Sequence, residues 1–339
     1  MTQRVCLIPG DGVGQEVIPA AAEVLASLGL GLEFSEAQAG FEYFEKSGEA
    51  IPDSTLATIE SCGAALFGAT ASPTTGAVAG YRSPILTMRK AFDLYANLRP
   101  SQSLPGPFSR PNLDLLIVRE NTEGLYAGRE RREGDTAIAE RVITAKGSER
   151  IARVAFENAA IRKSKNPNSK IPTVTIVHKA NVLKVTDGLF REQCLKVAAE
   201  YPEIVVKEML VDSMAMRLVK DPENFDVLVT TNLFGDILSD EASGLIGGLG
   251  VAPSANLGAN VAVFEPVHGS APDIAGQGIA NPIGAILSAA MLLDHIGQSA
   301  AADRVRAAVA ATLRSGCWPQ DLGGRAKTGE VKVAVMRNL

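Results

Sequence analysis

Short, almost continuous apolar runs alternate with longer stretches of helical periodicity along the 339-residue chain. Runs without polar alternation are typical of strands that are covered on both faces. The alternation therefore predicts an α/β fold with a largely parallel sheet at its core. The predicted strands are 4–10, 64–69, 113–121, 173–181, 225–232 and 261–269, and the predicted helices are 15–28, 84–95, 148–162, 187–201 and 282–296.

Two segments depart from this alternation. Residues 103–112 are rich in proline and are interpreted as a crossing between lobes. Residues 125–146 are highly charged and loosely alternating, which fits a protruding strand pair used for dimer contact or, nearly as well, a mobile surface loop.

Three of the predicted strands end in polar residues, at 119–121, 178–181 and 231–232. In open α/β sheets the ligand crevice lies beyond the carboxyl ends of the strands. Ordinary solvated turns would explain any one of these endings, but they explain three less well. The pattern therefore predicts one shared polar site.

Composition narrows the class of protein. The length suggests about two domains, and 46% hydrophobic with 21% charged residues indicates a globular chain. A net charge of -5 argues mildly against nucleic acid or an acidic membrane as a partner. The four cysteines form no C-x-x-C pair, which favours buried reduced thiols. Without an apolar signal segment or a run of about 18 apolar residues, we expect a soluble, cytoplasmic protein.

The stretch NLFGDILSDEASGLIGGLG, at 232–250, places Asp236 and Asp240 one helical turn apart on one face. No Lys or Arg within the stretch offsets the two charges. Carboxylates suit Mg²⁺ or Mn²⁺, and Asp212 is a third candidate ligand. A solvated helix face, or charges favoured by the helix dipole, is the competing interpretation.

Three arginines stand among or directly after apolar residues: Arg89, Arg99 and Arg119. Arginine binds carboxylate groups bidentately and stays charged. If the three converge, they fit a substrate with more than one carboxylate. Each could equally be a surface side chain or an ion-pair partner.

Two further residues are candidates for acid–base chemistry. Lys179 could act as a base if nearby cations lower its pKa, and Tyr126 could act as an acid. When each residue is considered by itself, Lys179 is better explained as a surface charge and Tyr126 as a packed aromatic ring.

Two glycine-containing loops, 9–14 and 265–282, could bring backbone N–H groups close to phosphates. Neither matches G-x-G-x-x-G with an acidic residue at the proper distance. A standard Rossmann site is therefore not expected.

Together these motifs resemble the β-decarboxylating dehydrogenases, that is, the isocitrate, 3-isopropylmalate and homoisocitrate dehydrogenases. The resemblance runs from IPGDGVGQEV near the start to PQDLGG at 319–324, and NLFGDILSDEASGLIGGLG is similar to the metal signature of the family at nearly every position. It implies a two-lobed isopropylmalate dehydrogenase-like fold that is not a Rossmann fold. Residues 1–100 with 253–339 would form the cofactor-side lobe, and 101–252 the second lobe with the dimer interface.

The resemblance also implies roles for the acid–base and metal candidates. Asp236 and Asp240 would bind Mg²⁺ or Mn²⁺, with Asp212 reaching in from a partner subunit. Lys179, also from the partner, would take the proton of the substrate hydroxyl, and Tyr126 would protonate the product enol. Shared sites imply a homodimer or tetramer. The residues implied around the substrate are Ser83, Arg89, Arg99, Arg119, Tyr126, Lys179 and Asn181.

Cofactor choice is expected to depend on Asp273. The resemblance implies that its carboxylate accepts from the adenosine ribose hydroxyls and repels a 2′-phosphate. NADP-using relatives tend to have Lys-Tyr where this chain has Asp273 and Ile274, so NAD is expected. The residues implied around the dinucleotide are Asn181, Glu265, His268, Gly269, Ser270, Ala271, Asp273 and Asn281.

Substrate choice is expected to lie in the residues before Arg89. Isopropylmalate enzymes tend to be leucine-rich there, and isocitrate enzymes tend to have Asn where this chain has Ile85. Ser83-Pro84-Ile85 looks like homoisocitrate dehydrogenases, as do 187–194 and 211–219, although bacterial relatives have Arg at the position of Leu86. The implied activity is NAD-dependent oxidative decarboxylation of homoisocitrate, a hydroxy tricarboxylate, to 2-oxoadipate in lysine biosynthesis.

Three alternatives stay open. The chain could be a 3-isopropylmalate dehydrogenase of leucine biosynthesis, which Ile85 and Leu86 would favour. It could act on isocitrate, alone or in addition. A non-catalytic regulatory homologue is disfavoured, because such a protein would be expected to lose acid–base or metal positions that are all present here.

Overall fold

The computed structural model describes residues 3–71, 73, 78–165 and 171–339. The chain forms two compact units that are each assembled from separate segments. The first consists of Met1–Leu94, Leu104–Pro111 and Ile246–Leu339, and the second of Tyr95–Ser103 and Asn112–Leu245. The proline-rich segment predicted as a crossing contains the short excursion that returns to the first unit.

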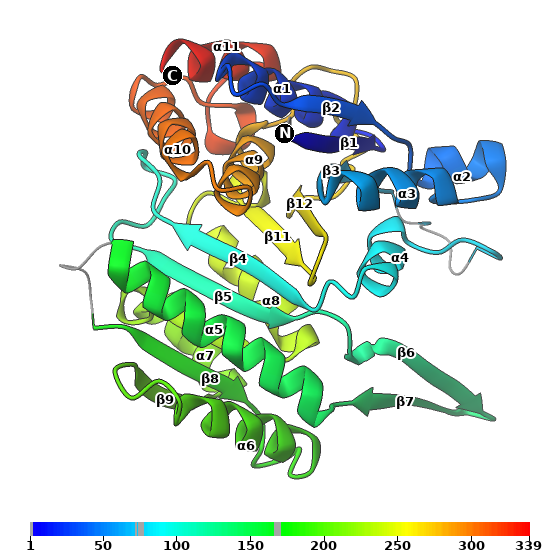
Figure 1. The fold of residues 1–339 in the computed structure, drawn as a ribbon, viewed down its shortest axis with the longest axis vertical. Coiled ribbons are helices and arrows are strands. Elements are labelled where there is room, and N and C mark those ends of the chain that lie inside the picture. The colour runs from blue at the N-terminus through cyan, green and yellow to red at the C-terminus, as the bar shows by residue number, and fades with distance from the viewer. Residues whose placement is uncertain (1–2, 72, 74–77, 166–170) are drawn as a thin grey trace. The chain divides into compact units, whose positions relative to one another are not determined.

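The first unit contains five strands of a mostly parallel sheet in the order β2-β1-β3-β12-β11 (Figure 1). All neighbours are parallel except β12 and β11. β3 is buried along its whole length, as its continuous apolar run AALFGA predicts. The strands are β1 (Arg4–Gly10), β2 (Glu33–Glu36), β3 (Ala64–Ala69), β11 (Pro253–Leu257) and β12 (Ala262–Pro266).

The second unit also contains five strands, in the order β4-β5-β10-β8-β9. β4 is antiparallel to β5, and the other neighbours are parallel. The predicted α/β fold with a mostly parallel sheet is therefore confirmed. The strands are β4 (Ala96–Gln102), β5 (Asp114–Glu120), β8 (Thr173–His178), β9 (Val205–Leu210) and β10 (Val227–Thr230).

The charged segment after β5 forms a separate antiparallel pair, β6 (Gly124–Glu133) and β7 (Thr136–Val142) (Figure 1). Of the two predicted forms, the structure has the strand pair. Most of its residues are exposed, which agrees with the high charge of the sequence.

Helices and short 3₁₀ turns connect the strands. Helix α4 stops earlier than predicted, because Asp93 adopts a left-handed backbone (φ 44°) that a helix cannot continue through. The first unit holds α1 (Gly14–Ser27), α2 (Phe41–Ser47), α3 (Asp53–Cys62), α4 (Pro84–Ala91), η2 (Leu249–Val251), α9 (Ile283–His295), α10 (Ser299–Arg314), η3 (Gln320–Leu322) and α11 (Thr328–Arg337). The second holds α5 (Ala145–Lys165), α6 (Thr186–Ala198), α7 (Val211–Lys220), η1 (Pro222–Asn224) and α8 (Asn232–Gly244).

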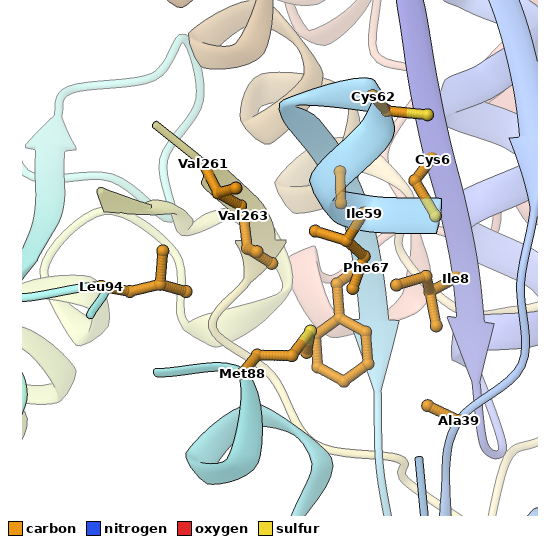
Figure 2. Packing of buried hydrophobic residues seen from close by; sticks show 11 residues of the cluster. Cys6, Ile8, Ala39, Ile59, Cys62, Phe67, Met88, Leu94, Val261 and Val263 are labelled. Carbon is orange, nitrogen blue, oxygen red and sulfur yellow. The ribbon is translucent and has the colours of Figure 1, made fainter. Parts of the chain in front are cut away.

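An apolar cluster in the first unit packs strands β1, β3 and β12 against helices α3 and α4 (Figure 2). Phe67 and Met88 lie side by side in it, so the helix that follows Ser83 is anchored to the sheet. All four cysteines are free thiols, and only Cys317 is not fully buried. Among the described residues, no helix combines the length and apolar character needed to cross a membrane.

Candidate active site

The polar strand ends of the second unit lie side by side. In the parallel register, Thr230 of β10 is level with Arg119 of β5 on one side and with Val177 of β8 on the other. The residues that follow these positions therefore emerge at one edge of the sheet. The prediction that the three polar endings meet is confirmed.

Arg119 is the best-buried cation at this edge, with a side chain 1% exposed. Its Nη1 donates to Oδ1 of Asp236 at 2.5 Å, and its Nε and Nη2 donate to Oδ1 of Asn232. Both acceptors are on α8. Gly235 makes this approach possible, because a Cβ there would lie 2.6 Å from Cγ of Arg119.

Arg99 contacts the same face of α8 from strand β4. Its Nη1 lies 3.0 Å from Oδ1 of Asp240 and 2.8 Å from Oγ of Ser239, and its Nη2 lies 3.5 Å from Asp236. The sequence interpretation that Asp236 and Asp240 lack a basic neighbour holds only within 232–250. In the folded unit, Arg99 from β4 and Arg119 from β5 pair with the carboxylates, because α8 packs against both strands.

Tyr126 closes the other side of this cluster. Its phenol donates to Oδ2 of Asp236, and the guanidinium of Arg119 lies 5.2 Å from its ring centre. Burial, and then the hydrogen bond to Asp236, raise the pKa of Tyr126. Burial also raises the pKa of Asp240, against the lowering effect of Arg99. The phenol is thus held in its protonated, proton-donating form.

Lys179 and Asp212 form a second pair in the same unit. Lys179 directly follows β8, and its Nζ lies 2.5 Å from Oδ1 of Asp212 in the first turn of α7. The hydrogen bond from Lys179 lowers the pKa of Asp212. Asn181 is exposed two residues beyond Lys179.

The three predicted metal ligands do not come together within one chain. Asp236 and Asp240 share a face of α8, whereas Asp212 is paired with Lys179. Across the described ranges, no three His, Cys, Asp or Glu side chains are arranged to hold a metal ion. This is the arrangement expected if Asp212 serves another subunit, and that expectation stays a prediction.

The α8 face nevertheless suits a hard cation. Its donors are carboxylate oxygens, which Mg²⁺ and Mn²⁺ prefer. Each carboxylate is paired with a guanidinium at ion-pair distance, so a metal cation bound here would replace Arg99 and Arg119 as the partner of these aspartates. The buried Nδ2 of Asn232 has no hydrogen-bond partner, which leaves a donor next to Asp236 that an oxygen-rich ligand would satisfy.

Arg89 belongs to the first unit. It is buried on α4, its Nε donates to Oδ1 of Asn256 at 3.3 Å, and its Nη2 lies 3.8 Å from Glu265. Asn256 in turn donates to Glu265 at 2.8 Å. A predicted substrate residue and a predicted cofactor residue are therefore linked through Asn256, which no pattern in the sequence singled out. Ser83 immediately precedes α4.

The two glycine-containing loops also meet in the first unit. The N–H of Val13 donates to the carbonyl of Ser270 at 2.9 Å, and a Cβ on Gly12 would overlap that same carbonyl. Ala271 has a positive φ of 39°, so the chain turns sharply there. Gly269 is exposed, and a Cβ there would meet nothing within 4 Å, so this backbone is open to a ligand.

The side chains of the second loop fit a dinucleotide. Nε2 of His268 is buried without a hydrogen-bond partner, and burial lowers the pKa of this imidazole. Asn281 accepts from the N–H of Ile283 and donates to Asp321. Asp273 is exposed and therefore accessible to ribose hydroxyls. Asp321 was not predicted, because it is an exposed residue and no sequence pattern distinguishes it from other surface carboxylates.

Comparison with known proteins agrees with these observations. The family model described as isocitrate/isopropylmalate dehydrogenase matches residues 4–335. An isocitrate/homoisocitrate dehydrogenase of Thermus thermophilus is 56% identical over 100% of this chain and 99% of its own length. A 3-isopropylmalate dehydrogenase of Methanothermobacter thermautotrophicus is 47% identical, with the same coverage of both chains.

A solved structure gives the same result for the fold. The crystal structure of isocitrate dehydrogenase from Methylococcus capsulatus superposes with a TM-score of 0.92 and 44% identity. The match covers 100% of this chain and 99% of the other.

Proposed function

This chain belongs to the isocitrate/isopropylmalate dehydrogenase family, and from that premise we propose that it converts homoisocitrate to 2-oxoadipate with NAD. Members of the family are β-decarboxylating dehydrogenases that depend on NAD(P) and a divalent metal, act on hydroxy acids and typically form dimers. The chain is such an enzyme. The substrate, the choice of NAD, a role in lysine biosynthesis and a cytoplasmic location are parts of the proposal.

The contact of Arg119 and Tyr126 with Asp236 carries the proposal for the site. It gathers a carboxylate-binding cation, a proton donor and a metal-ligand candidate around one helix turn. Arg99 adds a second guanidinium at the same turn. If a metal cation binds the two aspartates, the guanidiniums of Arg99 and Arg119 are released from them. Both guanidiniums can then bind the carboxylates of the substrate.

Two residues of this chain then carry out the two proton transfers. Lys179 takes the proton of the substrate hydroxyl as the carbinol is oxidised, and Tyr126 returns a proton to the enol that follows loss of the β-carboxylate. When bound, NAD supplies the hydride acceptor, and Mg²⁺ or Mn²⁺ on Asp236 and Asp240 supplies Lewis-acid stabilisation of negative charge. Arg99 and Arg119 orient the carboxylates, since a guanidinium fork matches their geometry.

Several features support the proposal that each active site contains Lys179 and Asp212 from a partner subunit. Lys179 and Asp212 are already joined as a pair, so one subunit can deliver both together. Large apolar side chains nearby in sequence are exposed, which favours burial against another copy. They are Val182, Val185, Met216, Val219 and Ile237. In this proposal the lobes are 1–100 with 253–339, and 101–252, and dimer contact uses the second.

The support for homoisocitrate is the sequence of α4 and the 56% identical relative, whose name includes that substrate. One observation favours 3-isopropylmalate instead. Leu86 on α4 is exposed and apolar, as is suitable for an alkyl group. Asp273 supports NAD over NADP, because an exposed carboxylate would repel a 2′-phosphate.

The test is a comparison of kcat/KM for homoisocitrate, isocitrate and 3-isopropylmalate, each with Mg²⁺ and with NAD or NADP. We expect homoisocitrate with NAD to give the highest value. A preference for 3-isopropylmalate would reject the substrate and retain the reaction class. Tyr126→Phe is the control for chemistry at this site, and it should slow turnover of whichever substrate is preferred.

A further inference from the structure

The carboxylate of Asp187, in the first turn of α6, is completely buried, with 0% exposure. One of its oxygens accepts from Nη1 of Arg141 on β7. The other accepts from the backbone N–H of Lys179 at 2.6 Å. A carboxylate removed from water requires such partners, so this ion pair ties Arg141 to the backbone of the proposed base.

Arg141 extends the same connection to helix α8. Its Nη2 donates to Oγ1 of Thr231 at 2.8 Å, and its guanidinium lies 5.0 Å from the ring centre of Phe234. Thr231 is the N-cap residue of α8, yet its side chain makes no capping bond to the helix. The hydroxyl accepts from Arg141 instead, which fixes the start of the helix that carries Asp236 and Asp240.

We propose that Arg141 and Asp187 are positioning residues for the reaction. Their buried ion pair holds the backbone of Lys179 and the first turn of α8 in one fixed relation. The inference rests on the base role proposed for Lys179. Misplacing a reacting group by about 1 Å can cost about 100-fold in rate, so a pair that never touches substrate can still control turnover.

The Arg141–Asp187 pair also connects two different active sites. If Lys179 serves the partner's site while Asp236 and Asp240 serve their own, the Arg141–Asp187 pair joins residues of two different sites within one subunit. The pair would then keep both sites in the same geometry. An ordinary stabilising ion pair would have no such effect.

The chain offers a matched control at the other end of β8. Oδ1 of Asp226 lies 2.7 Å from Nε of Arg162, and its Oδ2 accepts from the N–H of Thr173 at 3.2 Å. Thr173 is the first residue of β8, whereas Lys179 follows its last. The two pairs thus share their chemistry and their strand, but only one contacts the strand end that carries Lys179.

The test replaces each pair with apolar side chains, as Asp187→Leu with Arg141→Met and as Asp226→Leu with Arg162→Met. Replacing both partners avoids leaving a buried charge unpaired, which keeps the loss of stability small. Urea midpoints, kcat and the KM of the preferred substrate are measured for the dimer. We expect the first double variant to lose about 10- to 100-fold in kcat, with KM changed less than about threefold. The control should keep kcat within about twofold.

Equal losses of kcat in the two double variants, or losses that follow the urea midpoints, would overturn the proposal. If the first double variant does not fold, Arg141→Lys decides. This variant keeps the positive charge but loses the second guanidinium nitrogen, which donates to Thr231. We therefore expect kcat to fall about 10-fold, and an unchanged kcat would overturn the inference. Lys179→Met is measured in parallel. Full activity in that variant would reject the proposed base and the inference with it, whereas slow turnover there with a normal double variant rejects only the positioning role.

Discussion

Replacing Gly235 with alanine should destabilise the protein, although alanine is the better helix former. Within α8 the change gains about 1 kcal/mol of helix propensity. The new Cβ would lie 2.6 and 2.7 Å from Cγ and Cβ of Arg119. Arg119 cannot move aside freely, because Asn232 and Asp236 hold its guanidinium. Overpacking of this kind costs about 1–3 kcal/mol, so we expect a net loss of about 0–2 kcal/mol.

Gly244→Ala is the matched control, since it lies on the same helix and its Cβ would meet nothing within 4 Å. It should stabilise the protein by up to about 1 kcal/mol. Urea unfolding at one protein concentration measures the difference between the variants, and kcat/KM should fall only in Gly235→Ala, because Arg119 is displaced. A Gly235→Ala protein as stable and as active as Gly244→Ala would refute the argument that close packing on Arg119 requires glycine.

Three further predictions concern the ligands and pH. Asp236→Asn should weaken Mn²⁺ binding by about 100-fold or more, because it removes a charged ligand, and electron paramagnetic resonance of free Mn²⁺ would show it; wild-type affinity would reject the metal assignment. Asp273→Ala should raise the Kd for NAD by about 10-fold, the value of one charge-assisted hydrogen bond, and calorimetry showing unchanged affinity would exclude that role. Burial lowers the pKa of His268 below its ordinary value, so the unfolded chain binds its proton first and stability is lost as the pH falls below about 6.5. His268→Asn should therefore make the urea midpoint depend less on pH between about pH 5 and 7. An equally steep pH dependence in the variant would contradict the lowered pKa of His268.

The sequence was most informative where side chains are uniformly buried. The apolar runs at 4–10 and 64–69 predicted β1 and β3 at their true bounds. Strands of mixed polarity were missed: β4 contains Arg99 and a proline, and β9 is an edge strand with exposed residues. Hydrophobic patterns cannot identify such strands, because the buried positions of β4 include the polar residues Asn97, Arg99 and Ser101 and β9 has no fully buried position.

The residues of the proposed site could be selected from the sequence, but the contacts between them could not. Strand ends indicated where polar side chains would gather, and the parallel register brought them together. The pairing of Arg99 with Asp240 joins positions 141 residues apart, so no local pattern could reveal it. Asp187 likewise gave no signal, because its importance lies in burial and in the backbone N–H that it accepts.

The discontinuous first unit constrains how the protein can fold during its synthesis. β3 leaves the ribosome about 190 residues before β12, the strand that pairs with it, a delay of roughly 10–40 s at 5–20 residues per second. Throughout that interval the wholly apolar β3 has an open edge, and such edges promote aggregation. The second unit, whose last residue is Leu245, is synthesised completely within that interval. We therefore expect the middle of the chain to fold first, while the earliest-made segment depends on a chaperone until the last strands arrive.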